Sequence, residues 1–476
     1  MREPFWLRSP GTALAEPRND LMRSTTSGAG TGRAPAAGNR VSAPSPRLDH
    51  FAAAVPKSLP DWMVLLATLW FGSYAYLYWY GIGGLKPLHS YFVLIGLTGL
   101  WLLARLALLS AALPVRDSWL SAFFLWCATY FAYTLFTHAV LAMGYAEAEP
   151  LVIAAQFVAI TGAFVLLMSS PRRLSLAMVA FAATAIAATM LNIFDFLSPT
   201  FSAVAGRAAG LYVNPTISGN WIAMAMVAGL AAVPRRLRPV FVAFCGLGVL
   251  LTFSRESWLV WGIALIWIVR HGHLGGIRRS RLKTLMGLTI GGAILLFVFS
   301  GGLGQLVGQS QFRAYLNENT LARLGISGNV LSGESADERT FLIFHSLSEA
   351  AEAPVLGKGF GYTQNWGNLP RPHNMFLLFF VEGGIVGVGI FAALVLILWR
   401  GSVGLGRVVV GLFIVTSFFS HNNLEQPATM LLVAFALAHG ALARRPLKGS
   451  VVAGELASLY RAPQLPAYAT MRAGIR

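Results

Sequence analysis

The sequence predicts an all-α, polytopic integral membrane protein with about twelve transmembrane helices. Of its 476 residues, 56% are hydrophobic and only 12% are charged, whereas a soluble protein carries about 25% charged residues. Apolar runs of roughly 15–25 residues recur along most of the chain, which is the length needed to cross a hydrocarbon core. Cys127 and Cys245 both lie inside apolar runs, a pattern that indicates neither a disulfide framework nor a metal site.

The composition divides the chain into five regions. Residues 1–57 are rich in Ser, Gly, Pro, Ala and Arg, so we expect a disordered cytoplasmic tail. We expect nine spans in 58–303, one large periplasmic loop in 304–372, three spans in 373–443 and a second cytoplasmic tail in 444–476. The expected spans cover residues 62–80, 91–113, 119–142, 150–169, 174–192, 217–233, 239–253, 257–270, 284–303, 373–398, 408–421 and 428–443.

The basic residues predict the orientation. With both termini in the cytoplasm, 28 of the 36 Lys and Arg residues fall on the cytoplasmic side, and 12 of the 19 acidic residues fall on the other. The short loops alone follow the same split, as the positive-inside rule requires. The net charge of +17 therefore reports membrane topology, and we expect no nucleic-acid partner.

Several basic residues lie at the outer ends of the expected spans. They are Arg207 before NPTISGN, Arg255 in LLTFSRESW, and Arg371 and His373 in RPHN. Arg339 instead opens ERTFLIFHSLSEAAEA, which we expect to form an amphipathic helix on the membrane surface within the large loop. Such a cation can simply extend to lipid headgroups, and we expect this for Lys86, Arg313 and Lys358. Arginine forks also match diphosphate oxygens, and a histidine can take a proton from a sugar hydroxyl.

The remaining polar residues near these ends have structural explanations. Asn374, after Pro372, is a good helix cap. Glu382 lies deep in an expected span, so it should meet an arginine or face a polar cavity. We expect His138 and His421 to be hydrogen-bonded structural residues. No carboxylate or Cys/His group has metal-ligand spacing, so no metal is expected, and a lipid-diphosphate enzyme and an anion transporter remain equal alternatives at this point.

Residues 200–440 resemble the O-antigen ligase and polymerase family of bacterial membrane glycosyltransferases. The resemblance is carried by NPTISGN, LLTFSRESW, ERTFLIFHSLSEAAEAPVLGKGFGY and RPHNMFLLFFVEGGIVG, in that order. It implies about twelve transmembrane helices, a large periplasmic loop, and glycan transfer from undecaprenyl diphosphate to an acceptor hydroxyl. The transfer would use neither metal nor nucleotide and would invert the anomeric centre.

The resemblance also implies roles for individual residues. His373 corresponds to the proposed general base, and Arg339 and Arg255 to the arginines that hold the donor diphosphate. Arg207 is a weaker match by its place before the Asn-Pro turn, and Asn374, Glu382 and Arg371 would support the site. One departure is Glu256, which follows Arg255 where the family usually has a small residue.

The expected protein is thus an inner-membrane glycosyltransferase that is active on the periplasmic side. Its partners would be the lipid-linked donor, the lipid bilayer and an acceptor, with the lipid A core expected and no cofactor required. The alternatives are an O-antigen or exopolysaccharide polymerase, which would use a growing glycan as acceptor, and a protein O-oligosaccharyltransferase. A polysaccharide transporter is disfavoured because spans three to nine hold almost no charge and no internal repeat is visible.

Overall fold

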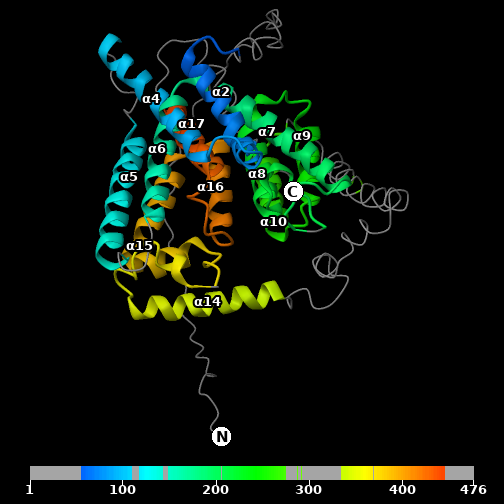
Figure 1. Ribbon diagram of the computed structural model, residues 1–476. Helices are drawn as coiled ribbons and strands as arrows, with labels where there is room; N and C mark the ends of the chain where they lie inside the picture. The colour runs from blue at the N-terminus through cyan, green and yellow to red at the C-terminus, as the bar shows by residue number, and fades with distance from the viewer. Residues whose placement is uncertain are drawn as a thin grey trace, which may run out of the picture. The chain divides into compact units, whose positions relative to one another are not determined.

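The computed structural model describes residues 55–109, 117–142, 148–204, 206–274, 334–367 and 369–444, with 287 and 291 as isolated positions. Within these ranges every regular element is helical (Figure 1). Several expectations fall outside them: the N-terminal tail up to residue 54, the span at 284–303, the first part of the expected loop up to residue 333, and the tail from residue 445.

The longer helices are apolar enough to cross a membrane. Six qualify by length and composition among the described residues, and they are α4 (Pro87–Leu109), α5 (Ser118–Thr137), α6 (Glu149–Leu167), α7 (Pro171–Leu197), α15 (Met375–Gly401) and α17 (Pro427–Arg444). The other α-helices of the described residues are α2 (Leu59–Gly72), α3 (Ala75–Gly81), α8 (Pro215–Gly229), α9 (Arg238–Leu250), α10 (Arg255–Arg270), α14 (Glu334–Glu352) and α16 (Gly404–Ser417).

Each expected span within the described ranges overlaps a helix, but span one differs from the expectation. The run 62–80 is not one continuous helix: α2 ends at Gly72 and α3 starts at Ala75. Tyr74 between them has a left-handed backbone, with φ of 60°. Its hydroxyl donates to Gln426 Oε1 at 3.1 Å and its ring packs on Tyr212. These tertiary contacts stabilise the break between α2 and α3, which the continuous apolar run does not predict.

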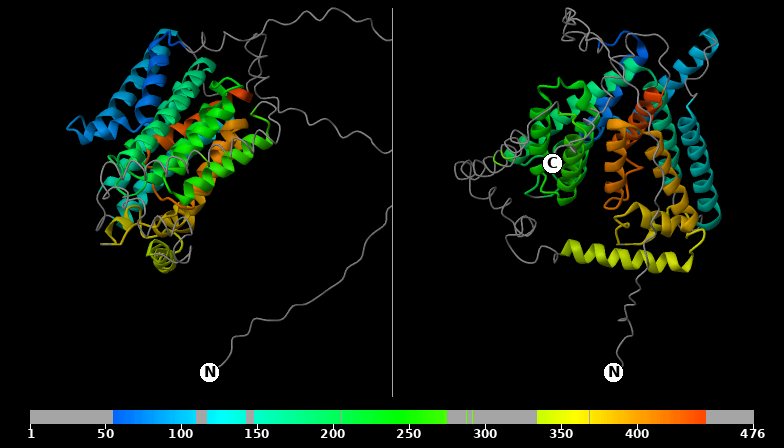
Figure 2. Two further views of the ribbon diagram at one scale, coloured as in Figure 1. Left: turned by 90° about the vertical axis from the view of Figure 1, so that its right-hand side faces the viewer. Right: turned by 180° about the vertical axis from the view of Figure 1, so that it is seen from behind.

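Two ends of the helical bundle can be told apart in Figures 1 and 2. Helices α8, α10, α15 and α17 begin at the end that α14 crosses, whereas α7 and α9 begin at the opposite end. We call these the α14 end and the basic end. The basic end takes its name from Arg172, Arg173, Arg235, Arg236 and Arg444, which lie at the helix termini there.

Small residues allow the helices to approach closely. A side chain at Gly219 of α8 would lie 2.5 Å from Ser257 Cβ of α10. Aromatic rings fill the space between α5, α6 and α15, where the Trp126 and Tyr130 rings stack with centroids 5.0 Å apart. Phe379 of α15 completes this cluster. Close approach of backbones is the usual basis of helix packing in lipid, where burial of apolar surface gives little driving force.

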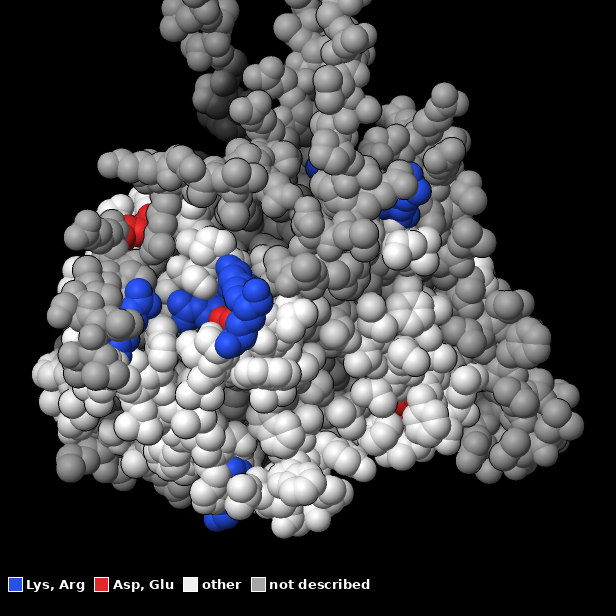
Figure 3. Space-filling model, turned by 90° about the horizontal axis from the view of Figure 1, so that it is seen from above, with Lys and Arg blue, Asp and Glu red and all other residues white. Residues whose placement is uncertain are grey.

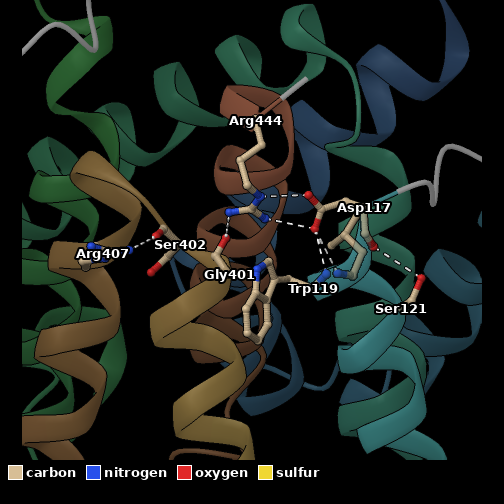
Figure 4. Close-up of polar contacts among 8 residues, drawn as sticks. Asp117, Trp119, Ser121, Gly401, Ser402, Arg407 and Arg444 are labelled. Carbon is tan, nitrogen blue, oxygen red and sulfur yellow. Dashed lines mark hydrogen bonds and ion pairs between the residues drawn. The ribbon is translucent and has the colours of Figure 1, made fainter. Parts of the chain in front are cut away.

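One arginine joins three helices at the basic end. Arg444, the last residue of α17, donates from Nε and Nη2 to the Asp117 carboxylate at 2.9 and 3.0 Å, and from Nη1 to the carbonyl of Gly401 at 2.9 Å (Figure 4). Asp117 also caps α5 by accepting from the backbone of Trp119 and Leu120. The starts of α5 and the ends of α15 and α17 are therefore held in fixed register.

Candidate functional site

The N-termini of α8 and α10 lie side by side at the α14 end. Asn214 caps α8 and Ser254 caps α10 through their side chains, so the turns expected from NPTISGN and LLTFSRESW are confirmed. The Ser257 hydroxyl donates to Asn220 Oδ1 at 3.0 Å, and Ser254 donates to Thr216 at 3.1 Å. These bonds explain why the two motifs are rich in small polar residues.

Two of the expected arginines flank this junction. Arg207 is half-buried and donates from Nε to the carbonyl of Thr252 at 2.9 Å, which fixes its guanidinium beside the start of α10. Arg255 is exposed and is the first residue of α10. The helix N-terminus adds partial positive charge of its own, so the junction favours an anion.

Glu256, which stands where the family usually has a small residue, has a hydrogen-bond partner in the structure. Its buried carboxylate accepts from Asn220 Nδ2 at 2.6 Å, and it interacts electrostatically with Arg339 of α14. Arg339 is therefore close enough to Glu256 to interact with its charge, although more than 80 positions separate the two in the chain. The acid beside Arg255 thus accepts from an amide of α8 and interacts with the arginine of α14.

Helix α14 presents two different faces. Leu342, Ser346 and Ala350 are buried at helical spacing, whereas Phe341 and Phe344 are 54% and 68% exposed. The helix crosses the end of the bundle instead of joining it (Figure 1). An amphipathic helix at this level is thus confirmed, and its apolar outer face is the feature that membrane-surface helices use.

The turn after α14 inserts into a break in α15. Gly384 has a non-helical backbone, with φ of 58° and ψ of −158°. The Lys358 and Gly359 N–H groups donate to the carbonyls of Val381 and Glu382, both at 2.9 Å, and Ile385 donates to Pro354 at 2.9 Å. Segment 354–359, hereafter the docking turn, thus satisfies the backbone groups that the break exposes.

Glycines make this docking possible. Gly357 and Gly359 both have positive φ, 70° and 97°, where glycine alone is unstrained. A Cβ on Gly357 would lie 2.5 Å from the Gly384 nitrogen. Phe360 is buried just beyond and packs on Phe379 at 5.4 Å. The GKGFG string is therefore a docking element for α15.

The position of Lys358 differs from the one expected from the sequence. It was expected to extend to lipid headgroups, but its Nζ donates to Glu349 at 2.7 Å and to Glu352 at 2.6 Å. Burial would lower the pKa of Lys358, but these carboxylates outweigh it and raise that pKa. The expectation is wrong because the docking turn brings Lys358 back onto α14.

Glu382 is buried and lies beside the break in α15 at Gly384. It accepts hydrogen bonds from the hydroxyl and the backbone N–H of Thr363, which follows the docking turn. It also lines an open pocket of about 430 Å³ together with Arg371, His421 and Glu425. The expected polar surroundings of Glu382 are confirmed, since the acid lies in a cavity with a nearby arginine.

The start of α15 carries the histidine that the sequence singles out. Asn374 caps the helix by accepting from Phe376 and Leu377 at 2.8 and 3.2 Å, so the predicted cap is confirmed. His373 is half-buried immediately before the cap, with its ring 5.5 Å from that of His421. His373 is thereby fixed at the end of a membrane-spanning helix.

A half-buried ion pair lies next to these histidines. Arg371 Nη1 donates to Glu425 Oε1 at 2.9 Å. Burial raises the pKa of Glu425, and Arg371 partly offsets this. Burial, together with the charges of His373 and Arg371, lowers the pKa of His421 to about 4. His421 is therefore neutral near pH 7.

Residues 240–392 match a family model described as O-Antigen ligase. This segment is similar to the O-antigen ligase family. No curated protein matches the chain.

The O-antigen ligase segment contains most of the expected site residues. It includes α9, α10, the described part of the expected loop, and α15 as far as residue 392. Arg255, Arg339, Arg371, His373, Asn374 and Glu382 lie within it, whereas Arg207 precedes it. Two groups result, one around Arg255 and Arg339 and one around His373, and both lie at the α14 end.

Sequence reasoning missed the partners of the second group. His421 had been expected to be structural, yet it faces His373 across 5.5 Å and its Nδ1 has no hydrogen-bond partner within the described residues. Glu425 was not singled out, although it pairs with Arg371. Both lie in the connection from α16 to α17, and the polar run HNNLEQ between two apolar segments was the available signal.

Proposed function

We propose that the chain is an O-antigen ligase-like glycosyltransferase that moves a glycan from undecaprenyl diphosphate to an acceptor hydroxyl. The proposal is supported above all by one observation: the O-antigen ligase segment holds Arg255, Arg339 and His373 on elements that meet at one end of the bundle. The lipid tail of such a donor stays in the bilayer, so its diphosphate lies at the level of the helix ends.

In this mechanism His373 acts as the general base. Its ring takes the proton of the acceptor hydroxyl while the oxygen attacks the anomeric carbon of the donor sugar. The bond from that carbon to the phosphate oxygen breaks, and undecaprenyl diphosphate leaves with the electron pair. Attack opposite to the leaving group inverts the anomeric centre. General-base assistance of this kind is worth about 10² to 10⁴ in rate.

The arginines would bind the leaving diphosphate. Arg339 and Arg255 are both exposed and lie near Glu256, and Arg207 is held at the same junction by its bond to Thr252. Guanidinium forks bind phosphate oxygens in pairs. Such donors stabilise the negative charge that builds up on the leaving group, and no metal is required for this.

We further propose that the α14 end is periplasmic and that the basic end is cytoplasmic, in a bacterial inner membrane. The distribution of Lys and Arg supports this orientation. Reporter fusions after residues 235 and 446 should report cytoplasm, and a fusion near residue 330 should report periplasm. A cytoplasmic signal near residue 330 would contradict the proposed location of the site.

The test of the reaction is glycan transfer in reconstituted vesicles, with donor binding measured separately. We expect His373→Ala to lose about 10² to 10⁴ of the transfer rate while it still binds the lipid-linked donor. His271→Ala is the matched control, because His271 is an exposed histidine at the basic end, and it should transfer normally. Near-normal transfer by His373→Ala would leave His373 a structural residue.

The acceptor is decided by the same assay. We expect transfer to the lipid A core, so the reaction should yield a glycan-capped core lipid. Parallel reactions offer a lipid-linked repeat unit or a protein hydroxyl in its place. Elongation of the lipid-linked repeat without transfer to the core would make the protein a polymerase, and transfer to the protein alone would make it an O-oligosaccharyltransferase.

A further inference from the structure

Three arginines converge at the basic end, away from the candidate site. Arg105 and Arg173 both approach the ring of Trp101, with guanidinium carbons 5.7 and 4.9 Å from its centroid. Arg172 is the chain neighbour of Arg173 at the start of α7. Figure 3, which looks down on this end, shows basic side chains gathered on it with an acid among them.

The described residues supply only one carboxylate to this cluster. Asp61 pairs with Arg172 at 3.1 Å and also accepts from the backbone N–H of Lys57. Three guanidinium groups against one carboxylate leave a net charge of about +2 on this Arg105–Arg173 cluster. Arg105 and Arg173 both approach the Trp101 ring, and their like charges oppose each other.

Arg173 is the arginine of this cluster whose charge is least compensated. Its side chain is only 6% exposed, and its Nε donates to Ser170 Oγ at 2.8 Å. Its Nη1 is buried and has no hydrogen-bond partner in the described part of the chain. A buried charged donor without a partner is costly. An anion that bridges Arg173 and Arg105 would satisfy the donor and relieve the repulsion.

The surface beside the cluster indicates what carries the anion. Helix α4 carries exposed leucines on the N-terminal side of Arg105, and Leu100 and Leu103 are 66% and 63% exposed. Trp101, on the same helix, contacts the guanidinium groups, and tryptophan favours the membrane interface. A phosphate bound by the arginines would therefore have the apolar leucine side chains of α4 next to it.

We propose that Arg105, Arg172 and Arg173, with Trp101, form a site for the phosphate of one anionic phospholipid whose acyl chains lie along α4. A phosphate oxygen accepts from the buried Nη1 of Arg173, and charge-assisted bonds of this kind are the strong ones. The site is separate from the α14 end, so it requires nothing of the glycosyltransferase proposal.

Native mass spectrometry of the full-length protein in detergent tests this site. Wild type should retain one phosphatidylglycerol per chain under conditions that remove zwitterionic phosphatidylethanolamine. The Arg105→Gln/Arg173→Gln variant should bind phosphatidylglycerol at least tenfold more weakly. Arg235→Gln/Arg236→Gln is the matched control, because both residues are exposed at the same end, and it should bind as wild type does.

Three results would overturn the proposal. They are equal retention of the two lipids by wild type, unchanged binding by the double variant, and complete displacement of the lipid by millimolar inorganic phosphate, which would make this a free-phosphate site. If the double variant fails to fold, the single Arg105→Gln variant serves instead, since Arg105 is only half-buried. Its affinity for phosphatidylglycerol should still fall measurably, and wild-type affinity would reject the site.

Discussion

Replacing Gly384 by alanine tests the break in α15, on which the position of Glu382 depends. With φ of 58° and ψ of −158°, Gly384 occupies a region that is essentially restricted to glycine. A Cβ there would overlap the carbonyl of Val355 and lie 2.6 Å from the Gly357 nitrogen. Both atoms belong to the backbone of the docking turn, so no side-chain rotation can relieve the overlap.

The size of the effect follows from these contacts. The backbone conformation alone costs alanine about 1 to 3 kcal/mol. Moving the docking turn away also breaks four backbone hydrogen bonds, from the N–H groups of Lys358, Gly359, Ile385 and Val386, each worth about 0.5 to 1.5 kcal/mol. The free energy of unfolding should therefore fall by about 3 to 9 kcal/mol, a large part of the roughly 5 to 15 kcal/mol of a typical protein.

Thermal unfolding in detergent, followed by tryptophan fluorescence, measures this loss. Gly389→Ala is the matched control: Gly389 lies in the same helix with helical backbone, and a Cβ there meets nothing within 4 Å. Alanine in a helix is favoured over glycine by about 1 kcal/mol, so the control should melt at or slightly above the wild-type temperature. Gly384→Ala should melt well below both.

Equal melting temperatures for the two variants would refute the reasoning. They would mean that α15 tolerates a regular helical backbone at Gly384, and hence that the docking turn does not hold the break open. A low melting temperature with normal glycan transfer would have a different meaning. The break would then stabilise the fold without positioning the site.

Three further predictions concern stability. Asn374→Ala should destabilise the protein by about 1 kcal/mol, the usual value of a lost N-cap, as measured by urea unfolding. Glu382→Leu should melt below Glu382→Gln, because leucine leaves both Thr363 donors unsatisfied, at about 1 to 3 kcal/mol for each; the reverse order would contradict this. Burial would raise the pKa of Asp117, but Arg444 and the capping bonds outweigh it and lower that pKa. The stability advantage of wild type over Asp117→Asn should therefore hold above about pH 4 and shrink as the pH falls further, and a gap that widens in acid would be inconsistent with the pair.

The sequence by itself determined the features that depend on local patterns. Long apolar runs located most of the membrane-length helices within the described ranges, because only a helix satisfies its own backbone in lipid, although the run 62–80 divides into α2 and α3. Asn374 was recognisable as a cap because a cap is a property of one residue and its next three neighbours. The order of the motifs was enough to indicate the O-antigen ligase family.

The tertiary structure alone decided the features that join distant segments. Nothing in the sequence marks Gly384 as a break, since the apolar run continues on both sides of it, and the break forms only because segment 354–359 supplies hydrogen bonds to it. The same holds for Lys358. Its sequence setting is that of a lipid-facing cation, but in the structure it forms ion pairs with Glu349 and Glu352.

The pairing of charges follows this rule at both ends of the bundle. Arg371 with Glu425, Glu256 with Arg339 and Arg444 with Asp117 are neighbours from different helices or loops. A single sequence gives the charge of each residue and the end at which it lies, because both follow from composition and span order. It does not give the partner, because the energy of an ion pair depends on a separation of a few ångströms, and only the packing of the helices sets that separation.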